Sequence, residues 1–192
     1  MRCFVALELP PEVQEAAGGV LRDLQGSGAD VKWVRPGNLH VTLKFLGEIK
    51  EGMVPALGQA LGRACAGRPA LELTLAGVGA FPDPRRPQVV WLGLTGDTAA
   101  LAELAGALEQ ELAGLGFAPE ARPFKAHVTL GRMRRGKRGS RPGPPSGPLT
   151  RDLLGLAGWQ GPAFRAGRVV LMKSTLTPQG SVYDPVQVVT LV

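Results

Sequence analysis

The stretch RPGNLHVTL at Arg35–Leu43 returns later in the chain as RPFKAHVTL at Arg122–Leu130. Six of the nine positions are identical at a fixed offset of 87 residues. The two copies contain the only histidines of the protein, His40 and His127, and in each copy a threonine follows two positions after the histidine. Both histidines therefore belong to one repeated motif, which is the first place to look for chemistry.

The alternation of polar and apolar residues predicts that each copy is a β-strand with one core face and one polar face. Side chains two positions apart on a strand share a face, so His40 lies beside Thr42 and His127 lies beside Thr129. The β-propensity of threonine would explain one such residue, but explains two at the same offset poorly. If the repeats pack about a pseudo-twofold axis, the two polar faces meet across a cleft and form one pocket.

Two histidines and two threonines in one pocket suit the chemistry of a phosphate ester. Histidine has an ordinary pKa of about 6.5, so one ring can accept a proton while another donates one near neutral pH. Threonine hydroxyls and nearby cations can hold the phosphoryl oxygens. No cysteine, further histidine or carboxylate stands at ligand spacing near the motifs. We therefore expect no metal and no cofactor. The alternative to a catalytic role is that His40 and His127 are core histidines satisfied by hydrogen bonds.

With these two motifs the chain resembles the 2H phosphoesterases, a family named for paired His-x-Thr-x motifs. It is most similar to the bacterial RNA 2′,3′-cyclic phosphodiesterases, historically called 2′-5′ RNA ligases. The resemblance covers nearly the whole chain. It is carried by Phe4–Pro10, by NLHVTLKFLG at Asn38–Gly47, by VWLG at Val90–Gly93, by HVTLGR at His127–Arg132, and by Tyr183 and Pro185.

The resemblance implies metal-independent hydrolysis of a 2′,3′-cyclic phosphate at an RNA end, giving a 2′-phosphate. In this interpretation His127 is the general base on water and His40 the general acid to the leaving 3′ oxygen, although pseudo-symmetry would allow the roles to be exchanged. Thr42, Thr129 and Arg132 would hold the non-bridging oxygens. The reverse reaction, joining the cyclic phosphate to a 5′-hydroxyl, would give a 2′-5′ linkage. The implied partners are RNA ends, tRNA fragments among them.

Arg132 takes its proposed role from the family, which carries an arginine three positions after the second motif's threonine. Strict alternation would place Arg132 on the core face with Val128 and Leu130. Gly131 offers a solution, because a glycine in a strand often marks a bulge or a strand end that re-aims the next side chain.

Other residues near the motifs are weaker candidates. Lys44 and Lys125 fall on the polar faces, but a charge at a sheet edge also prevents aggregation. Trp33 and Phe45 lie near the first motif, where an aromatic ring can stack on a base, but we expect both to pack in the core. We expect Tyr183 to be a packed tyrosine at a strand start.

The duplication extends beyond the motifs. Phe4 lies 36 residues before His40, and Trp91 lies 36 residues before His127. Strand, helix, short strand and motif strand therefore recur in the same order. This predicts an α+β fold in which residues 1–192 form a single 2H phosphoesterase domain. Its two pseudo-symmetric lobes would be duplicated β-α-β-β units, two antiparallel sheets facing a central cleft with helices outside.

Periodicity and turn residues predict the individual elements. A first helix is expected to open at Pro10-Pro11 and to end at Gly26-Ser27-Gly28. Further helices are expected over Met53–Ala66 and from a cap at Asp97 or Thr98 through Leu112, with a helical turn or two at Leu153–Trp159. Further strands are expected at Phe4–Leu9, Val31–Val34, Leu71–Leu75, Val89–Leu94, Arg168–Ser174 and Val186–Val192, a loop at Phe81–Pro87 and a turn at Pro178–Gly180.

Composition adds bounds on class and partners. The 192 residues are 44% hydrophobic, which is enough for a sizeable core. A net charge of +6 favours acidic partners such as nucleic acid. Seven basic residues lie in Arg132–Arg151, either as a solvated loop or as a segment that draws RNA to the cleft.

Cys3 and Cys65 are expected to be reduced and buried. With no signal peptide or membrane-length apolar run, we expect a soluble cytoplasmic protein. We also expect it to be a monomer.

A non-catalytic RNA-binding module would also explain the charge and the basic segment. It would not explain two matched His-x-Thr units on alternating strands. A phosphodiesterase acting on 2′-5′ oligonucleotides or small cyclic phosphates is a further alternative, because no feature of the sequence separates those substrates from an RNA end. Turnover in EDTA distinguishes an enzyme from a binding module.

Overall fold

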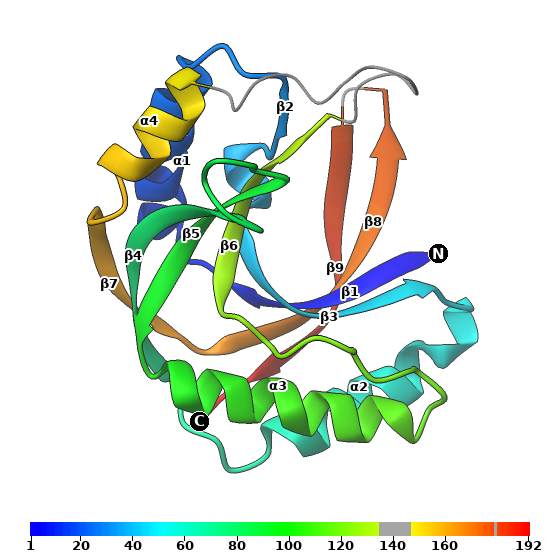
Figure 1. The fold of residues 1–192 in the computed structure, drawn as a ribbon. Coiled ribbons are helices and arrows are strands. Elements are labelled where there is room, and N and C mark those ends of the chain that lie inside the picture. The colour runs from blue at the N-terminus through cyan, green and yellow to red at the C-terminus, as the bar shows by residue number, and fades with distance from the viewer. Residues whose placement is uncertain (135–146, 179) are drawn as a thin grey trace.

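The computed structural model describes residues 1–134, 147–178 and 180–192 (Figure 1). Most of the basic segment and the middle of the predicted turn at Pro178–Gly180 lie outside these ranges. The strands are β1 Arg2–Glu8, β2 Val31–Trp33, β3 His40–Glu48, β4 Leu71–Phe81, β5 Val89–Gly96, β6 His127–Met133, β7 Gln160–Ala166, β8 Arg168–Thr177 and β9 Gly180–Thr190. The helices are α1 Pro11–Gln25, α2 Val54–Cys65, α3 Thr98–Ala113 and α4 Gly147–Gly155, with 3₁₀ turns at Pro36–Asn38 and Glu51–Met53.

The strands form one curled antiparallel sheet in the order β7-β4-β5-β6-β3-β1-β8-β9. The short strand β2 lies outside this order and pairs with Gly131–Met133 of β6. The two expected sheets are the halves of this sheet, β7-β4-β5-β6 and β3-β1-β8-β9. They join where the two motif strands pair through Val41 and Val128. The predicted α+β fold class is confirmed, with the two motif strands adjacent at the centre.

Each half of the sheet combines strands from both sequence repeats. β4 follows the first motif in the chain but pairs with β5 and β7, in the half that holds the second motif. β8 follows the second motif but pairs with β1, in the half that holds the first motif. The repeats therefore exchange strands, which local periodicity does not reveal.

The helices cover the outer face of the sheet, as Figure 1 shows. α1 contacts β7 and α4, and α4 contacts β4, so this pair covers one half. α2 contacts α3, β8 and β9, and α3 also contacts β3, so the second pair covers the other half. α1 illustrates the sequence logic: Pro11 begins it, Glu12 in the first turn complements the helix dipole, and the buried stripe includes Val13, Leu21 and Leu24.

Several element boundaries differ from the sequence predictions. α4 begins at Gly147, before the expected Leu153, and β6 runs through Arg132 to Met133, into the expected loop. The strand β7 was not predicted. A short strand was expected in both repeats, but among the described residues only the first repeat has one, β2. It pairs with β6 of the second repeat. The Asp97 carboxylate accepts a hydrogen bond from the Glu72 N–H at 2.8 Å and does not cap α3.

The two cysteines are free and buried, as predicted. Burial raises the pKa of the Cys65 thiol to about 11, which keeps it protonated and unreactive near neutral pH. Within the described ranges, none of the helices has the length and apolar character needed to cross a membrane.

Candidate active site

Both motif strands contain a β-bulge at the same repeat position. The pairing of β3 with β1 skips Leu43, and the pairing of β6 with β5 skips Leu130. These leucines are related by the 87-residue offset of the duplication. A bulge adds one residue to a strand, so the side chains beyond it exchange faces.

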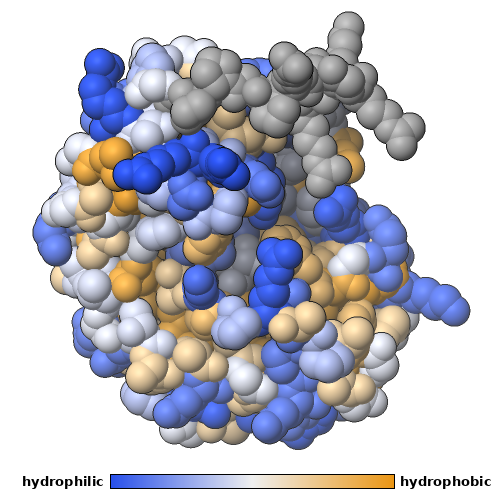
Figure 2. Space-filling model, in the orientation of Figure 1, coloured by the Kyte–Doolittle hydropathy of each residue, from blue (hydrophilic) through white to orange (hydrophobic). Residues whose placement is uncertain are grey.

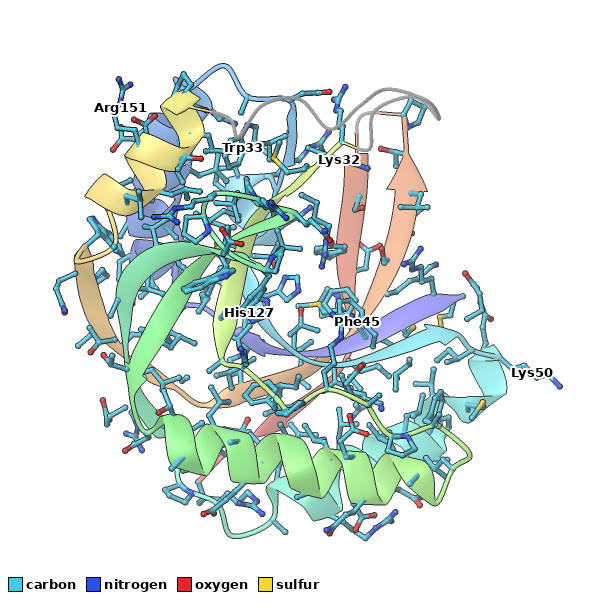
Figure 3. The ribbon with its side chains drawn as sticks, viewed as in Figure 1. Lys32, Trp33, Phe45, Lys50, His127 and Arg151 are labelled. Carbon is cyan, nitrogen blue, oxygen red and sulfur yellow. The ribbon has the colours of Figure 1, made fainter. Side chains whose placement is uncertain are left out.

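The bulges decide which residues after each histidine reach the pocket. Phe45 and Arg132 stand at equivalent repeat positions, and each returns to the face that carries its histidine and threonine. Arg132 is exposed, as the prediction of a bulge before it requires. Phe45 is 57% exposed, so the prediction that it packs in the core is wrong. Figure 3 shows Phe45 and His127 pointing toward the same central region from β3 and β6.

The pairing of β3 with β6 brings the two motifs together. Val41 and Val128 are paired and fully buried on the core face. In an antiparallel pair the flanking positions face each other, so His40 lies across from Thr129 and Thr42 lies across from His127. All four side chains are half-buried on the opposite face. Figure 2 shows this side of the molecule hollowed near its middle, with hydrophilic side chains at the rim.

Both imidazoles are held in the same orientation by the backbone. His40 Nδ1 lies 2.7 Å from the Asn38 carbonyl oxygen, and His127 Nδ1 lies 2.7 Å from that of Lys125. A carbonyl oxygen only accepts, so each Nδ1 donates and carries the proton of the neutral ring. Each Nε2 is left to exchange protons in the pocket. The Thr42 hydroxyl, 3.0 Å from His40 Nε2, is placed to donate to it.

Aromatic rings pack around His40. The Phe4 ring stacks on the imidazole with centroids 4.8 Å apart and an interplanar angle of 30°. The Tyr183 ring meets the imidazole edge-on at 5.5 Å and Phe4 at 4.9 Å. Asn38 Nδ2 donates to the Ser181 carbonyl at 2.8 Å, which ties β9 to the first motif. Tyr183 is therefore a packed tyrosine, as predicted.

The second motif has a similar aromatic surrounding. The Phe81 ring lies edge-on to His127, with centroids 5.2 Å apart and an angle of 90°. Trp91 packs on Phe81 at 5.2 Å, and Lys125 Nζ lies 5.5 Å from the Phe81 centroid. Lys125 is exposed beside the pocket. In both repeats, rings restrict the movement of the imidazole and remove water from it.

Burial lowers the pKa of both histidines. For His40, loss of hydration is the largest cause, opposed by the hydrogen bond to Asn38, and the nearby charge of His127 lowers its pKa further. For His127, loss of hydration is again the largest cause, opposed by the bond to Lys125, and the charge of Arg132 adds to the lowering. His127 therefore lies within electrostatic range of both His40 and Arg132.

Lys44 does not reach the pocket. Beyond the bulge its side chain points to the interior and is 5% exposed. Its ammonium donates to Glu109 Oε2 at 2.7 Å and to the Ala118 carbonyl at 2.6 Å. The suggestion that Lys44 lines the polar face is therefore wrong, and its role is to join β3 to α3 and the chain after it.

The residues that the structure describes offer no resident metal site. Among them, no three His, Cys, Asp or Glu side chains gather closely enough to hold an ion. The arrangement is instead two imidazoles held at Nδ1 by backbone carbonyls, two hydroxyls and one guanidinium. This set can move protons at a bound phosphate and hold its oxygens.

Comparison with known proteins supports the resemblance. The model of the LigT like phosphoesterase family matches residues 7–91 and again residues 92–183. The RNA 2′,3′-cyclic phosphodiesterase of Methanothermobacter thermautotrophicus is 32% identical over 192 residues, which is 100% of this chain and 99% of the relative. The protein of the same name from Archaeoglobus fulgidus is 34% identical over 98% of this chain and 99% of its own length.

Solved structures agree. The Thermus thermophilus protein TT0787 superposes with a TM-score of 0.77 at 27% identity, covering 100% of this chain and 98% of that one. Escherichia coli LigT complexed with 3′-AMP has a TM-score of 0.74 at 28% identity, over 99% and 97% of the two chains. With both halves of the sequence matched, this chain belongs to the LigT-like 2H phosphoesterase family.

Proposed function

We propose that this protein hydrolyses 2′,3′-cyclic phosphate ends of RNA to 2′-phosphate ends, without a metal ion. The observation that carries the proposal is a pair of histidines whose Nδ1 atoms are held by backbone carbonyls, so that each Nε2 is left for proton transfer. The pairing of Val41 with Val128 brings both histidines to one pocket. The relatives that match over their full length bear the name of this activity.

The reaction can be followed atom by atom. His127 Nε2 takes a proton from water as the water oxygen forms a bond to phosphorus. The bond from phosphorus to the ribose 3′ oxygen breaks, and protonated His40 gives its Nε2 proton to that oxygen. The product keeps the phosphate on the 2′ oxygen. Thr42, Thr129 and Arg132 hold the non-bridging oxygens, where negative charge develops.

The two motif strands differ at the position five residues after each histidine, and this difference supports the assignment of acid and base. Arg132 belongs to the motif of His127, and its positive charge favours the neutral imidazole that a base requires. Phe45 belongs to the motif of His40, where an exposed ring suits the nucleoside rather than the phosphate. The leaving 3′ oxygen is part of the nucleoside, so the acid belongs on this side.

The test is incubation of the purified protein in EDTA with an RNA oligonucleotide that ends in a 2′,3′-cyclic phosphate. We expect the mass to rise by one water and the new end to be a 2′-phosphate. An unchanged oligonucleotide would contradict the proposal. It would favour either an enzyme that acts on small cyclic phosphates or 2′-5′ oligonucleotides, or a non-catalytic module that binds RNA such as tRNA fragments. Activity that EDTA abolishes would contradict the metal-free mechanism. Adding a 5′-hydroxyl RNA tests the reverse reaction by formation of a 2′-5′ linkage.

The pH dependence follows from the direction of the pKa shifts. In the free enzyme burial lowers the pKa of both histidines below 6.5, so one neutral and one protonated ring coexist only in acid. We expect kcat/KM to be bell-shaped with its maximum below pH 6.5, the two limbs belonging to the coupled pair. A bound anionic phosphate stabilises protonated His40, so the basic limb of kcat should lie at higher pH. A kcat/KM profile whose two limbs both lie above pH 6.5, with the basic limb of kcat at the same pH, would contradict this account.

Phe45 provides a test of nucleoside binding. Its exposed ring stands three residues after Thr42, beyond the bulge, and packs beside Phe4 with ring centroids 6.1 Å apart. Stacking of a base on an aromatic ring contributes about 1–3 kcal/mol, so Phe45→Ala should raise KM roughly tenfold or more. Phe45→Tyr should retain most of the affinity. Leu154→Ala, which removes a 56% exposed side chain on α4, is the matched control. Equal KM values in all three variants would exclude stacking at this ring.

A further inference from the structure

The pairing of β2 with β6 places a second cation beside the phosphate-binding arginine. Lys32 is the direct cross-strand partner of Arg132 in this antiparallel ladder. Directly paired residues have side chains on the same face with Cβ atoms about 5 Å apart. Both residues are exposed. Figure 3 shows Lys32 on the same side of the molecule as His127 and Phe45.

The two charges lack acidic partners in the part of the chain that the structure describes. There, no hydrogen bond or ion pair holds the Lys32 ammonium, and no carboxylate pairs with Arg132. Arg134, two positions further along, is different because its Nε lies 3.5 Å from Asp30 Oδ1. Like charges directly opposite in a ladder destabilise it. An unneutralised pair at this position is therefore explained better by a bound anion than by folding.

The positive charge continues on the other side of Arg132. There β6 pairs with β5 through Val89, and the loop before β5 is held to the end of β6 by the hydrogen bond from the Met133 N–H to the Gln88 carbonyl at 2.9 Å. This loop carries exposed Arg85 and Arg86. Cations thus occur on three segments that adjoin each other at the end of β6. Such an arrangement suits successive phosphates of a polynucleotide.

We propose that Lys32 binds an internal phosphodiester of the RNA strand, upstream of the nucleotide that carries the cyclic phosphate. This inference rests on the proposed function. Arg132 is within electrostatic range of His127 and serves the terminal phosphate. Lys32 lies on the neighbouring strand β2, on the edge of β6 opposite β5. A mononucleotide fills only the inner position, so Lys32 selects an RNA chain over a mononucleoside cyclic phosphate.

The experiment compares two substrates, a mononucleoside 2′,3′-cyclic phosphate and an RNA oligonucleotide with the same terminal nucleotide. For Lys32→Ala we expect kcat/KM on the oligonucleotide to fall roughly fivefold, the upper range for one exposed ion pair. Activity on the mononucleotide should stay unchanged. Lys32→Arg should retain the preference. Lys50→Ala is the charge-matched control, because this exposed lysine lies at the far end of β3 (Figure 3).

Binding gives an independent readout. The affinity of each variant for the 2′-phosphate oligonucleotide is measured by fluorescence anisotropy over a range of salt concentrations. Loss of one phosphate contact should reduce the slope of log K against log salt by about 0.7 for single-stranded RNA. An equal loss on both substrates, or no loss on the oligonucleotide, would overturn the assignment. If the wild-type protein turned over neither substrate, the proposed function would fail, while an unchanged salt slope would separately overturn the Lys32 contact.

Discussion

Replacing His127 or His40 by alanine is expected to lower kcat on a cyclic-phosphate RNA end by roughly 10² to 10⁴, because each change removes one proton transfer. The fold should survive, since both rings are only half-buried and lie on the pocket side of the sheet. Circular dichroism and the thermal midpoint check this. Activity equal to wild type in either variant would contradict the acid–base assignment.

The pH profiles of these variants separate the two roles. A base must be neutral to act, so protonation of His127 causes the fall of activity in acid. An acid must be protonated, so deprotonation of His40 causes the fall in base. The residual activity of His127→Ala should therefore lose the acidic limb, and that of His40→Ala should lose the basic limb. The opposite pattern would exchange the roles and leave the two-histidine mechanism standing.

Replacing Lys44 by methionine is expected to cost about 3 kcal/mol of unfolding free energy. The Lys44 side chain is nearly fully buried, and its replacement removes the ammonium that donates to Glu109 and to the Ala118 carbonyl. Glu109 keeps the weaker bond from the Glu120 N–H at 3.2 Å. Urea unfolding measures the change. Replacing both Lys44 and Glu109 by apolar residues should recover part of the loss, because no uncompensated charge then remains.

The chain contains a matched exposed pair for comparison. Arg63 Nε lies 2.8 Å from Glu111 Oε2, nearly the same separation as the 2.7 Å between Lys44 and Glu109. The Arg63 side chain is 56% exposed, against 5% for Lys44. Arg63→Met should therefore cost less than about 1 kcal/mol. If Lys44→Met and Arg63→Met lowered the unfolding free energy equally, burial would not determine how much the Lys44–Glu109 pair contributes to stability.

The sequence predicts the centre of the site well because the strand period is two and the motif is duplicated. That reasoning brings His40, Thr42, His127 and Thr129 to one face, and the structure places them so. It fails for Lys44 and Phe45 because alternation assumes a strand without extra residues. Leu43 gives no local sign of a bulge. Only Gly131 does, in the other repeat, where the bulge was predicted.

The remaining errors also have physical causes. β4 was predicted to end at Leu75, but it continues to Phe81 through glycines that the ladder requires. A Cβ at Gly79 would lie 2.5 Å from the Trp91 ring, and Gly77 has a φ of +73° at a register shift. β7 escapes detection because Gly161 and Pro162 interrupt its pattern. Strand partners such as β2 with β6 depend on tertiary packing, which spacing along the chain does not encode.

The exchange of strands between repeats has a consequence for how the protein can be divided. A fragment that ends between the repeats would keep β1 and β3 but lack β8 and β9, and would expose the edge of β4 that β5 covers. The complementary fragment would lack β4, so β5 and β7 would have no strand between them. Although the sequence is a tandem duplication, we expect neither copy to fold alone, and co-expressed copies to regain structure only by assembling with each other.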